Sequence, residues 1–221
     1  LDPALFEVRS GLLLDGERLA GASLYALAAQ SPLGEALDHL VLQRALRRLA
    51  RNRELRLIVN ISLNSLVSSD FVAWLGGRLK PEISMQGRLL LQISEADALI
   101  AQHHLGPFSE GLRELAIPLG IRHFGCSEEP LSYLPLMRTD FIRLDRSRSA
   151  DIGDNPQRRQ ALTTLCATLR GKSIGVIAAL IEDAALLPRL WEAGIHRVQG
   201  NCLQPPASAP RYRFPRRRSE A

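Results

Sequence analysis

The chain has 221 residues, of which 46% are hydrophobic, so it is long enough to bury a substantial core. Its formal net charge of +5 comes almost wholly from arginine and is concentrated near the end of the chain, where residues 208–221 are expected to form a basic, solvated tail. The three cysteines are odd in number and widely spaced, which excludes a disulfide-rich domain. No apolar run reaches 18 residues and no signal-peptide pattern is present, so the cytoplasm is favoured.

The first elements combine strand and helix patterns. Residues 6–14 and 19–22 are predicted as an opening antiparallel pair of strands joined at Asp15-Gly16, a dipeptide typical of hairpin turns. Residues 35–50 place their leucines on one face of a helix and their arginines on the other. Residues 55–61 then form a β-rich run, and Asp70 is expected to cap the next helix.

The rest of the chain alternates between strands and helices. The predicted strands cover residues 89–93, 117–123, 141–144, 174–179 and 196–199. The predicted helices cover residues 96–115, 157–170 and 183–193, and a helical turn is predicted around residues 131–137. Repeated strand–helix units without a glycine-rich phosphate loop predict an α/β fold, a TIM-like barrel of parallel strands over residues 1–207.

In parallel barrels, functional side chains gather at the carboxyl ends of the strands. In this sequence those ends are polar: they are Asn60, residues 92–95, 122–124, 143–145 and 179–182, and Gln199. The site is therefore expected at this rim. No helix-turn-helix, zinc finger or RNA-binding aromatic pair is present, so nucleic acid is not an expected partner.

The same strand ends resemble one known family. The similar segments are VNIS at 59–62, QISE at 92–95, FG at 124–125 with LSYL at 131–134, FIRLDRS at 141–147, VIA at 176–178 with Glu182, and VQG at 198–200. In this order and spacing, across residues 6–206, they resemble the EAL domains of cyclic-di-GMP phosphodiesterases. The resemblance implies an EAL-type barrel.

The departures from the family pattern concern its metal-binding carboxylates. The glutamate of the E-A-L signature aligns with Ser23, the first glutamate of E-[IL]-T-E with Gln92, and the paired aspartates with Arg122 and His123. The first glutamate of E-G-V-E aligns with Ala179. Mg²⁺ and Mn²⁺ need oxygen ligands, mostly carboxylates. The resemblance therefore predicts an inactive relative that needs no metal cofactor.

An inactive barrel of this family still has a ligand-binding role open to it. Cyclic-di-GMP is the expected ligand, and the candidate binding residues are Asn60, Gln92, Arg122, Arg143, Asp145, Glu182 and Gln199. Arginine suits phosphate because its guanidinium engages two oxygens at once. The family's ligand-gripping arginine is replaced by Leu27, which counts against binding. A purely structural alternative pairs Arg143 with Glu182 or Asp145.

Residues 124–130 and 200–206 further resemble the degenerate EAL domains of FimX-type regulators of type IV pili. That likeness implies a PilZ-type protein partner, and a homodimer through the apolar residues 131–137 is a further possibility alongside their burial in the core. Three functions stay open: a cyclic-di-GMP receptor, a ligand-free docking module and an enzyme. The lost carboxylates argue against the enzyme only.

Overall fold

The computed structural model describes residues 5–15, 17–28, 31, 33–79, 87–149, 152, 155–203 and 205–207. The predicted basic tail lies outside these residues. Seven strands form one sheet in the order β1-β4-β5-β6-β7-β8-β9, and each neighbouring pair is parallel. They are β1 (Leu5–Glu7), β4 (Arg56–Asn60), β5 (Leu89–Ser94), β6 (Leu119–Phe124), β7 (Phe141–Leu144), β8 (Gly175–Ala178) and β9 (Arg197–Val198).

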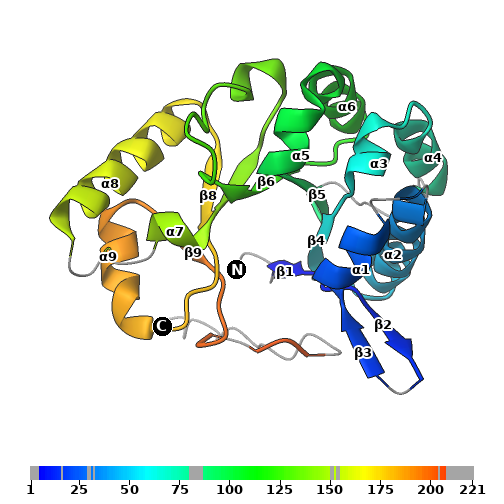
Figure 1. Cartoon of the computed structure of the whole chain (residues 1–221), viewed down its shortest axis with the longest axis horizontal. Coiled ribbons are helices and arrows are strands. Elements are labelled where there is room, and N and C mark those ends of the chain that lie inside the picture. The colour runs from blue at the N-terminus through cyan, green and yellow to red at the C-terminus, as the bar shows by residue number, and fades with distance from the viewer. Residues whose placement is uncertain are drawn as a thin grey trace, which may run out of the picture.

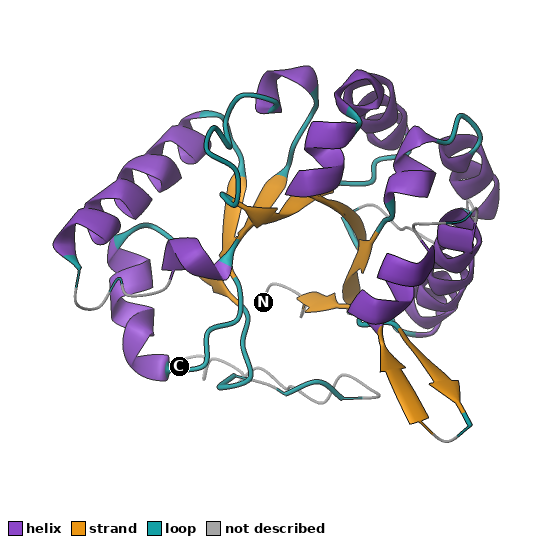
Figure 2. Ribbon diagram, viewed as in Figure 1, coloured by secondary structure: helices purple, strands orange, loops and turns teal. Residues whose placement is uncertain are grey.

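The sheet curves around the middle of the molecule, and the longer helices cover its outer face (Figure 1, Figure 2). The helices are α1 (Gly21–Ala28), α2 (Leu33–Arg51), α3 (Leu63–Val67), α4 (Phe71–Arg78), α5 (Glu95–Ile100), α6 (Gln102–Glu114), α7 (Arg146–Ser149), α8 (Pro156–Gly171) and α9 (Leu187–Glu192), with 3₁₀ turns η1 (Leu134–Leu136) and η2 (Ala184–Leu186). The predicted TIM-like α/β barrel is thus confirmed. Strands β1 and β9 are the edges of the described sheet. None of the described helices is long and apolar enough to cross a bilayer.

The predicted opening strand pair is present as β2 (Gly11–Leu14) and β3 (Glu17–Ala20), which pair antiparallel and project from the barrel (Figure 1). Two boundaries differ from the prediction. The run 6–14 divides, because its first part enters the parallel sheet as β1 beside β4. Residues 21 and 22, predicted as strand, begin helix α1 instead.

Two helix predictions also need correction. The predicted helix 96–115 is two helices, α5 and α6, which meet at Ala101. Asp70 directly precedes α4, but its side chain makes no capping hydrogen bond. Its carboxylate instead accepts a hydrogen bond from Ser69 Oγ at 3.2 Å, which leaves the first amides of α4 without this cap.

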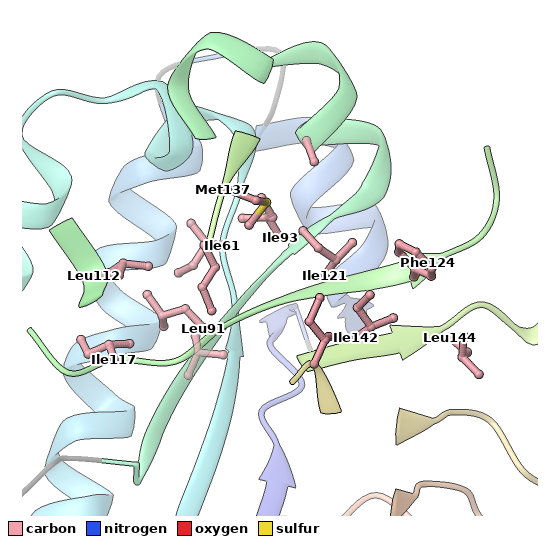
Figure 3. Close-up of a cluster of buried hydrophobic side chains, with 14 of the residues drawn as sticks. Ile61, Leu91, Ile93, Leu112, Ile117, Ile121, Phe124, Met137, Ile142 and Leu144 are labelled. Carbon is pink, nitrogen blue, oxygen red and sulfur yellow. The ribbon is translucent and has the colours of Figure 1, made fainter. Parts of the chain in front are cut away.

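Alternation along the strands divides the core into an outer and an inner part. Side chains such as Leu91, Ile121 and Ile142 belong to the outer part (Figure 3). They lie in the same core cluster as Leu112 of α6 and Met137, which follows η1. Each fully buried leucine or isoleucine of this kind contributes about 1.5–3 kcal/mol.

The inner part is a smaller apolar layer. It consists of Ile58, Leu90, Phe141 and Ile177, with Leu5 packed against them. A Cβ at Gly120 would lie 2.3 Å from the Phe141 ring, so glycine makes room for this aromatic side chain. This layer fills the interior of the curved sheet below the rim. The next inward-facing residues, two positions further along each strand, lie directly above it.

Candidate functional site

A polar layer follows the inner apolar layer at the rim of the barrel. Each of its members on a strand lies two residues after a member of the apolar layer. The apolar residues in question are Leu5, Ile58, Leu90 and Phe141. With Gln199, which follows β9, the polar residues form what we call the Glu7 cluster. Its members are Glu7, Asn60, Gln92, Arg143 and Gln199.

Hydrogen bonds connect this cluster around the carboxylate of Glu7. Arg143 Nη1 donates to Glu7 Oε1 at 2.5 Å, and the two side chains are only 9% and 7% exposed. Gln92 Nε2 lies 3.1 Å from the same oxygen and donates to Asn60 Oδ1 at 2.6 Å. Gln199 Nε2 donates to Glu7 Oε2 at 2.9 Å. Glu7 therefore links side chains from both edges and from the middle of the sheet.

The cluster lies in a cationic environment. Burial lowers the pKa of Arg143, Glu7 opposes this shift, and the charges of Arg9 and Arg122 lower the pKa further. An arginine stays charged even after such a shift. Arg143 thus interacts with two further arginine charges and one glutamate charge. An anion is attracted to such a surface.

Several polar atoms of the rim are buried without a partner among the described residues. They are Gln92 Oε1, Arg122 Nε and Arg143 Nε. Gln92 is fully buried, and Arg143 is 7% exposed. Buried polar groups are nearly always hydrogen-bonded, so unpartnered ones at one place indicate a position for water or a ligand.

The structure brings together four of the predicted binding residues and separates two others from them. Asn60, Gln92, Arg143 and Gln199 belong to the Glu7 cluster, and the charge of Arg122 acts on it. Arg143 pairs with Glu7, so neither of its two predicted structural partners, Glu182 and Asp145, is the observed one.

Glu182 is exposed and lies 3.4 Å from Arg146 Nη2. Asp145 Oδ2 lies 3.3 Å from His123 Nδ1, and Asp145 Oδ1 accepts the Ser147 amide at 2.9 Å. Burial raises the pKa of Asp145, but hydrogen bonds from Ser147, Cys126 and His123 outweigh it and bring the value to about 2. Asp145 is thus held as a carboxylate by these neighbours, apart from the Glu7 cluster.

Glu95, the last residue of the QISE segment at 92–95, is bound quite differently. Its side chain is 1% exposed, and Oε2 accepts the amides of Gly125, Cys126 and Ser127 at 3.0, 2.7 and 3.1 Å. Oε1 accepts the Ser127 hydroxyl at 2.9 Å and the Tyr133 hydroxyl at 3.4 Å. Consecutive amides that converge on one carboxylate fix the path of the chain. We call residues 125–127 the Glu95 loop.

With this geometry established, comparison with known proteins decides the family. A model of the EAL domain family matches residues 4–206. The chain belongs to the EAL domain family.

Solved structures agree with this membership. The FimX EAL domain from Pseudomonas aeruginosa, whose structure is described as bound to c-di-GMP, is 31% identical, with a TM-score of 0.88 over 97% of this chain and 88% of that one. The FimX EAL domain of Xanthomonas citri, in complex with c-diGMP, has a TM-score of 0.88 at 22% identity over 97% of this chain and 87% of that one, which shows the shared fold.

The curated relatives include longer proteins. This EAL domain is 28% identical to the cyclic di-GMP phosphodiesterase NbdA of Pseudomonas aeruginosa over 88% of the chain, and 23% identical to the cyclic di-GMP phosphodiesterase PdeF of Escherichia coli over 86%. It spans only 25% of NbdA and 26% of PdeF. The comparison therefore covers about a quarter of each relative.

The rim side chains of this EAL domain do not fit a divalent metal ion. Arg122 and Arg143 place fixed positive charges there, and the carboxylate of Glu7 is bound to Arg143. The Glu95 carboxylate is occupied by the loop amides. Among the described residues, no three His, Cys, Asp or Glu side chains group as metal ligands. Mg²⁺ and Mn²⁺ prefer several free oxygen ligands, a condition that these donors do not meet.

A third buried carboxylate, Asp38 of α2, holds the segment that follows β4. Asp38, fully buried in α2, accepts Tyr25 Oη at 2.8 Å and binds the Ser62 amide, the Ser62 hydroxyl and the Ser65 hydroxyl at 2.8, 2.6 and 2.7 Å. Burial raises the pKa of Asp38, and these hydrogen bonds oppose the rise. Ser62 follows Asn60 by two residues, so Asp38 fixes the chain where it leaves β4 for the rim.

Sequence reasoning missed Glu7 and the roles of Glu95 and Asp38. The period-two alternation from Leu5 would have placed Glu7 on the inner face. No local pattern indicates its partners, which are 85, 136 and 192 residues away along the chain.

Proposed function

We propose that this EAL domain is a cyclic-di-GMP receptor module that binds the dinucleotide without hydrolysing it. The observation that carries the proposal is the set of buried, unpartnered polar atoms on Gln92, Arg122 and Arg143 at the carboxyl ends of the strands. Parallel barrels place their ligands at this end. The similar FimX EAL domain of Pseudomonas aeruginosa is described as bound to c-di-GMP, which supports the choice of ligand.

The proposed lack of hydrolysis follows from the charges at the rim. Ser23, Gln92, Arg122, His123 and Ala179 stand where the family resemblance expects carboxylates. A metal ion would have to approach fixed arginine charges, and like charges repel strongly where water is scarce. Because metal ions activate the attacking water in such chemistry, a rim that repels them lacks its nucleophile.

Each candidate residue has a role in the proposed complex. Arg122 is the first phosphate ligand, because it is partly exposed and its Nε has no partner among the described residues. Arg143 is the second, once it is free to turn from Glu7. Asn60, Gln92 and Gln199 supply neutral hydrogen bonds, Asp145 keeps the rim polar, and the exposed Glu182 accepts hydrogen bonds from a guanine edge.

A ligand-free docking module is the second candidate. The pairing of Arg143 with Glu7 favours it, because an arginine already bound to a carboxylate is less available to phosphate. An apolar groove of about 590 Å³ between Leu131 and α8 provides a surface for a protein. Of the predicted apolar face, Leu134 and Met137 are buried, whereas Leu131 and Leu136 are exposed. A PilZ-type partner and a role in type IV pilus or motility regulation belong to the proposed receptor function, and a homodimer is compatible with either candidate.

Calorimetric titration with cyclic-di-GMP in EDTA separates the candidates. We expect a dissociation constant in the micromolar range, weakened about ten-fold by Arg122→Gln, since a charge-assisted hydrogen bond contributes about 1.5 kcal/mol or more. Arg138→Gln is the matched control, because its side chain is 74% exposed and pairs with Glu110 instead. No heat at several hundred micromolar contradicts the receptor, and hydrolysis with added Mn²⁺ contradicts the inactive assignment.

A further inference from the structure

The carboxylate of Glu7 lies where three side-chain donors of the rim converge. Both of its oxygens are used, Oε1 by Arg143 and Gln92 and Oε2 by Gln199. These are three of the side chains that a bound phosphate would need. A charged group of this chain therefore already holds the donors that the proposed function assigns to the ligand.

We propose that Glu7 is an internal anion that competes with the ligand's phosphate for Arg143 and so sets the affinity of the site. This inference rests on the proposed receptor function, which it deepens. The Arg143 Nη1 group donates to Glu7 at 2.5 Å, so a phosphate oxygen accepts this hydrogen bond only when Glu7 moves aside. The geometry also identifies what is released when it does: the Gln92 and Gln199 amides become free donors at the same moment.

Charge strengthens the competition. The charges of Arg9 and Arg122 act on Arg143, and the carboxylate of Glu7 opposes their effect. Removing its charge leaves the same surface more positive without altering any arginine. Because phosphate binding depends on this positive charge, the change strengthens binding and does not simply disturb the fold.

Competition of this kind has a simple arithmetic. The apparent dissociation constant equals the intrinsic constant divided by the fraction of molecules in the competent form. If Glu7 is turned away from Arg143 in about one molecule in ten, the apparent affinity is about ten-fold weaker than the rim alone would provide. The native domain therefore responds only to higher ligand concentrations than an unobstructed rim.

The pairing also joins the two edges of the sheet. Glu7 is the last residue of β1, Gln199 follows β9 directly, and these are the edge strands of the described sheet. Displacement of Glu7 breaks the side-chain hydrogen bond between them. Ligand binding and this contact between the edges therefore exclude each other.

The test is calorimetry of the whole 221-residue chain with cyclic-di-GMP, comparing the native protein with Glu7→Gln. Glutamine keeps the size of the side chain and removes its charge, so we expect the dissociation constant to fall at least ten-fold. Glu110→Gln is the matched control, because this exposed carboxylate on α6 pairs with Arg113. It loses the same charge away from the rim and is expected to leave binding within two-fold of the native value.

A second measurement distinguishes this inference from the receptor function. Inorganic phosphate at millimolar concentration is expected to raise the melting temperature of Glu7→Gln and to leave the native protein and Glu110→Gln unchanged. If cyclic-di-GMP binds no variant but phosphate stabilises Glu7→Gln alone, the receptor function fails and the internal anion stands. If native protein and Glu7→Gln bind cyclic-di-GMP equally, the internal anion fails and the receptor stands. If neither ligand has any effect on any variant, both fail.

A variant that keeps the charge covers the case in which Glu7→Gln does not fold. Glu7→Asp withdraws the carboxylate from Arg143 by one methylene group and keeps the pair neutral. We expect it to bind cyclic-di-GMP at least two-fold more tightly than the native protein. Equal or weaker binding by a cooperatively folded Glu7→Asp overturns the proposal.

Discussion

Glu7 and Glu95 are both buried carboxylates at the rim of the barrel, yet they are held by different kinds of partner. Glu95 accepts three backbone amides of its loop and two hydroxyls, all from residues 30–38 positions away. Glu7 is held by side chains alone, one of them a charged arginine.

This difference indicates that Glu95 has a structural role, whereas Glu7 belongs to the proposed binding site. Backbone amides stay where the fold puts them, so the position of Glu95 is independent of most substitutions around it. The side chains around Glu7 are able to rotate and to accept another anion in its place. A carboxylate bound by side chains can be exchanged for a ligand, whereas one bound by backbone amides belongs to the structure of the loop.

The largest expected effect comes from removing the charged partner of Glu7. Arg143→Met keeps an extended apolar side chain but leaves a buried carboxylate without its counter-charge, and breaking a buried ion pair in this way costs about 3–5 kcal/mol. Urea unfolding of the native protein and the variant measures the loss. The exposed Arg146→Met, at the first residue of α7, is the control and is expected to change stability by less than about 0.5 kcal/mol.

Combining this variant with Glu7→Gln sharpens the result. If the pair acts as one unit, the double variant is more stable than the sum of the two single losses predicts, by about 2 kcal/mol. Additive losses would show that Glu7 and Arg143 contribute independently, and the comparison with Glu95 would then lose its basis.

The next largest effect is expected at Glu95. Glu95→Gln removes the negative charge that the three loop amides bind and leaves one acceptor oxygen in place of two, so the hydrogen bonds of the buried loop weaken at a cost of about 2–3 kcal/mol. Urea unfolding again provides the measurement, with the exposed Glu129→Gln of the neighbouring segment as control. Ligand binding through Arg122 should weaken only if the Glu95 loop unfolds. A Glu95→Gln variant as stable as the native protein would show that the loop amides find another acceptor.

The same contrast explains how much the sequence predicts. Strand 141–144 is found at its predicted bounds, because its apolar pattern is local and Asp145 ends it. The rim position of Asn60, Gln92 and Gln199 also follows from sequence, since parallel strands place their carboxyl ends together. The partner of Arg143 does not follow, because Glu7 is 136 residues away and two nearer carboxylates suggest themselves. The curvature of the sheet, which no local pattern encodes, brings Glu7 of β1 to Arg143 of β7.

A smaller effect tests whether the backbone or the side chains hold Glu95. Ser127→Ala removes the hydroxyl that donates to Oε1 at 2.9 Å and keeps the Ser127 amide that donates to Oε2. We expect a loss of about 0.5–1.5 kcal/mol in the free energy of unfolding, the usual contribution of one hydrogen bond. Ser132→Ala, whose exposed hydroxyl donates to the Glu129 carbonyl, is the control. A loss as large as that of Glu95→Gln would mean that the hydroxyl, and not the amides, holds the carboxylate.

The smallest effect concerns Asp145, which combines both kinds of partner, the Ser147 amide and the His123 ring. Its pKa is lowered from 3.8 to about 2 in the folded protein. A lowered pKa means that the unfolded chain binds the proton first, so the stabilisation is complete above about pH 5 and is lost as the pH falls from there to about 2. Asp145→Asn cannot titrate, and its free energy of unfolding should therefore fall less steeply over this range than that of the native protein. Urea unfolding at pH 5, 4 and 3 measures the two slopes. Parallel slopes would mean that the hydrogen bonds to Asp145 do not favour its charged form, and that this carboxylate, unlike Glu7 and Glu95, is not held by its neighbours.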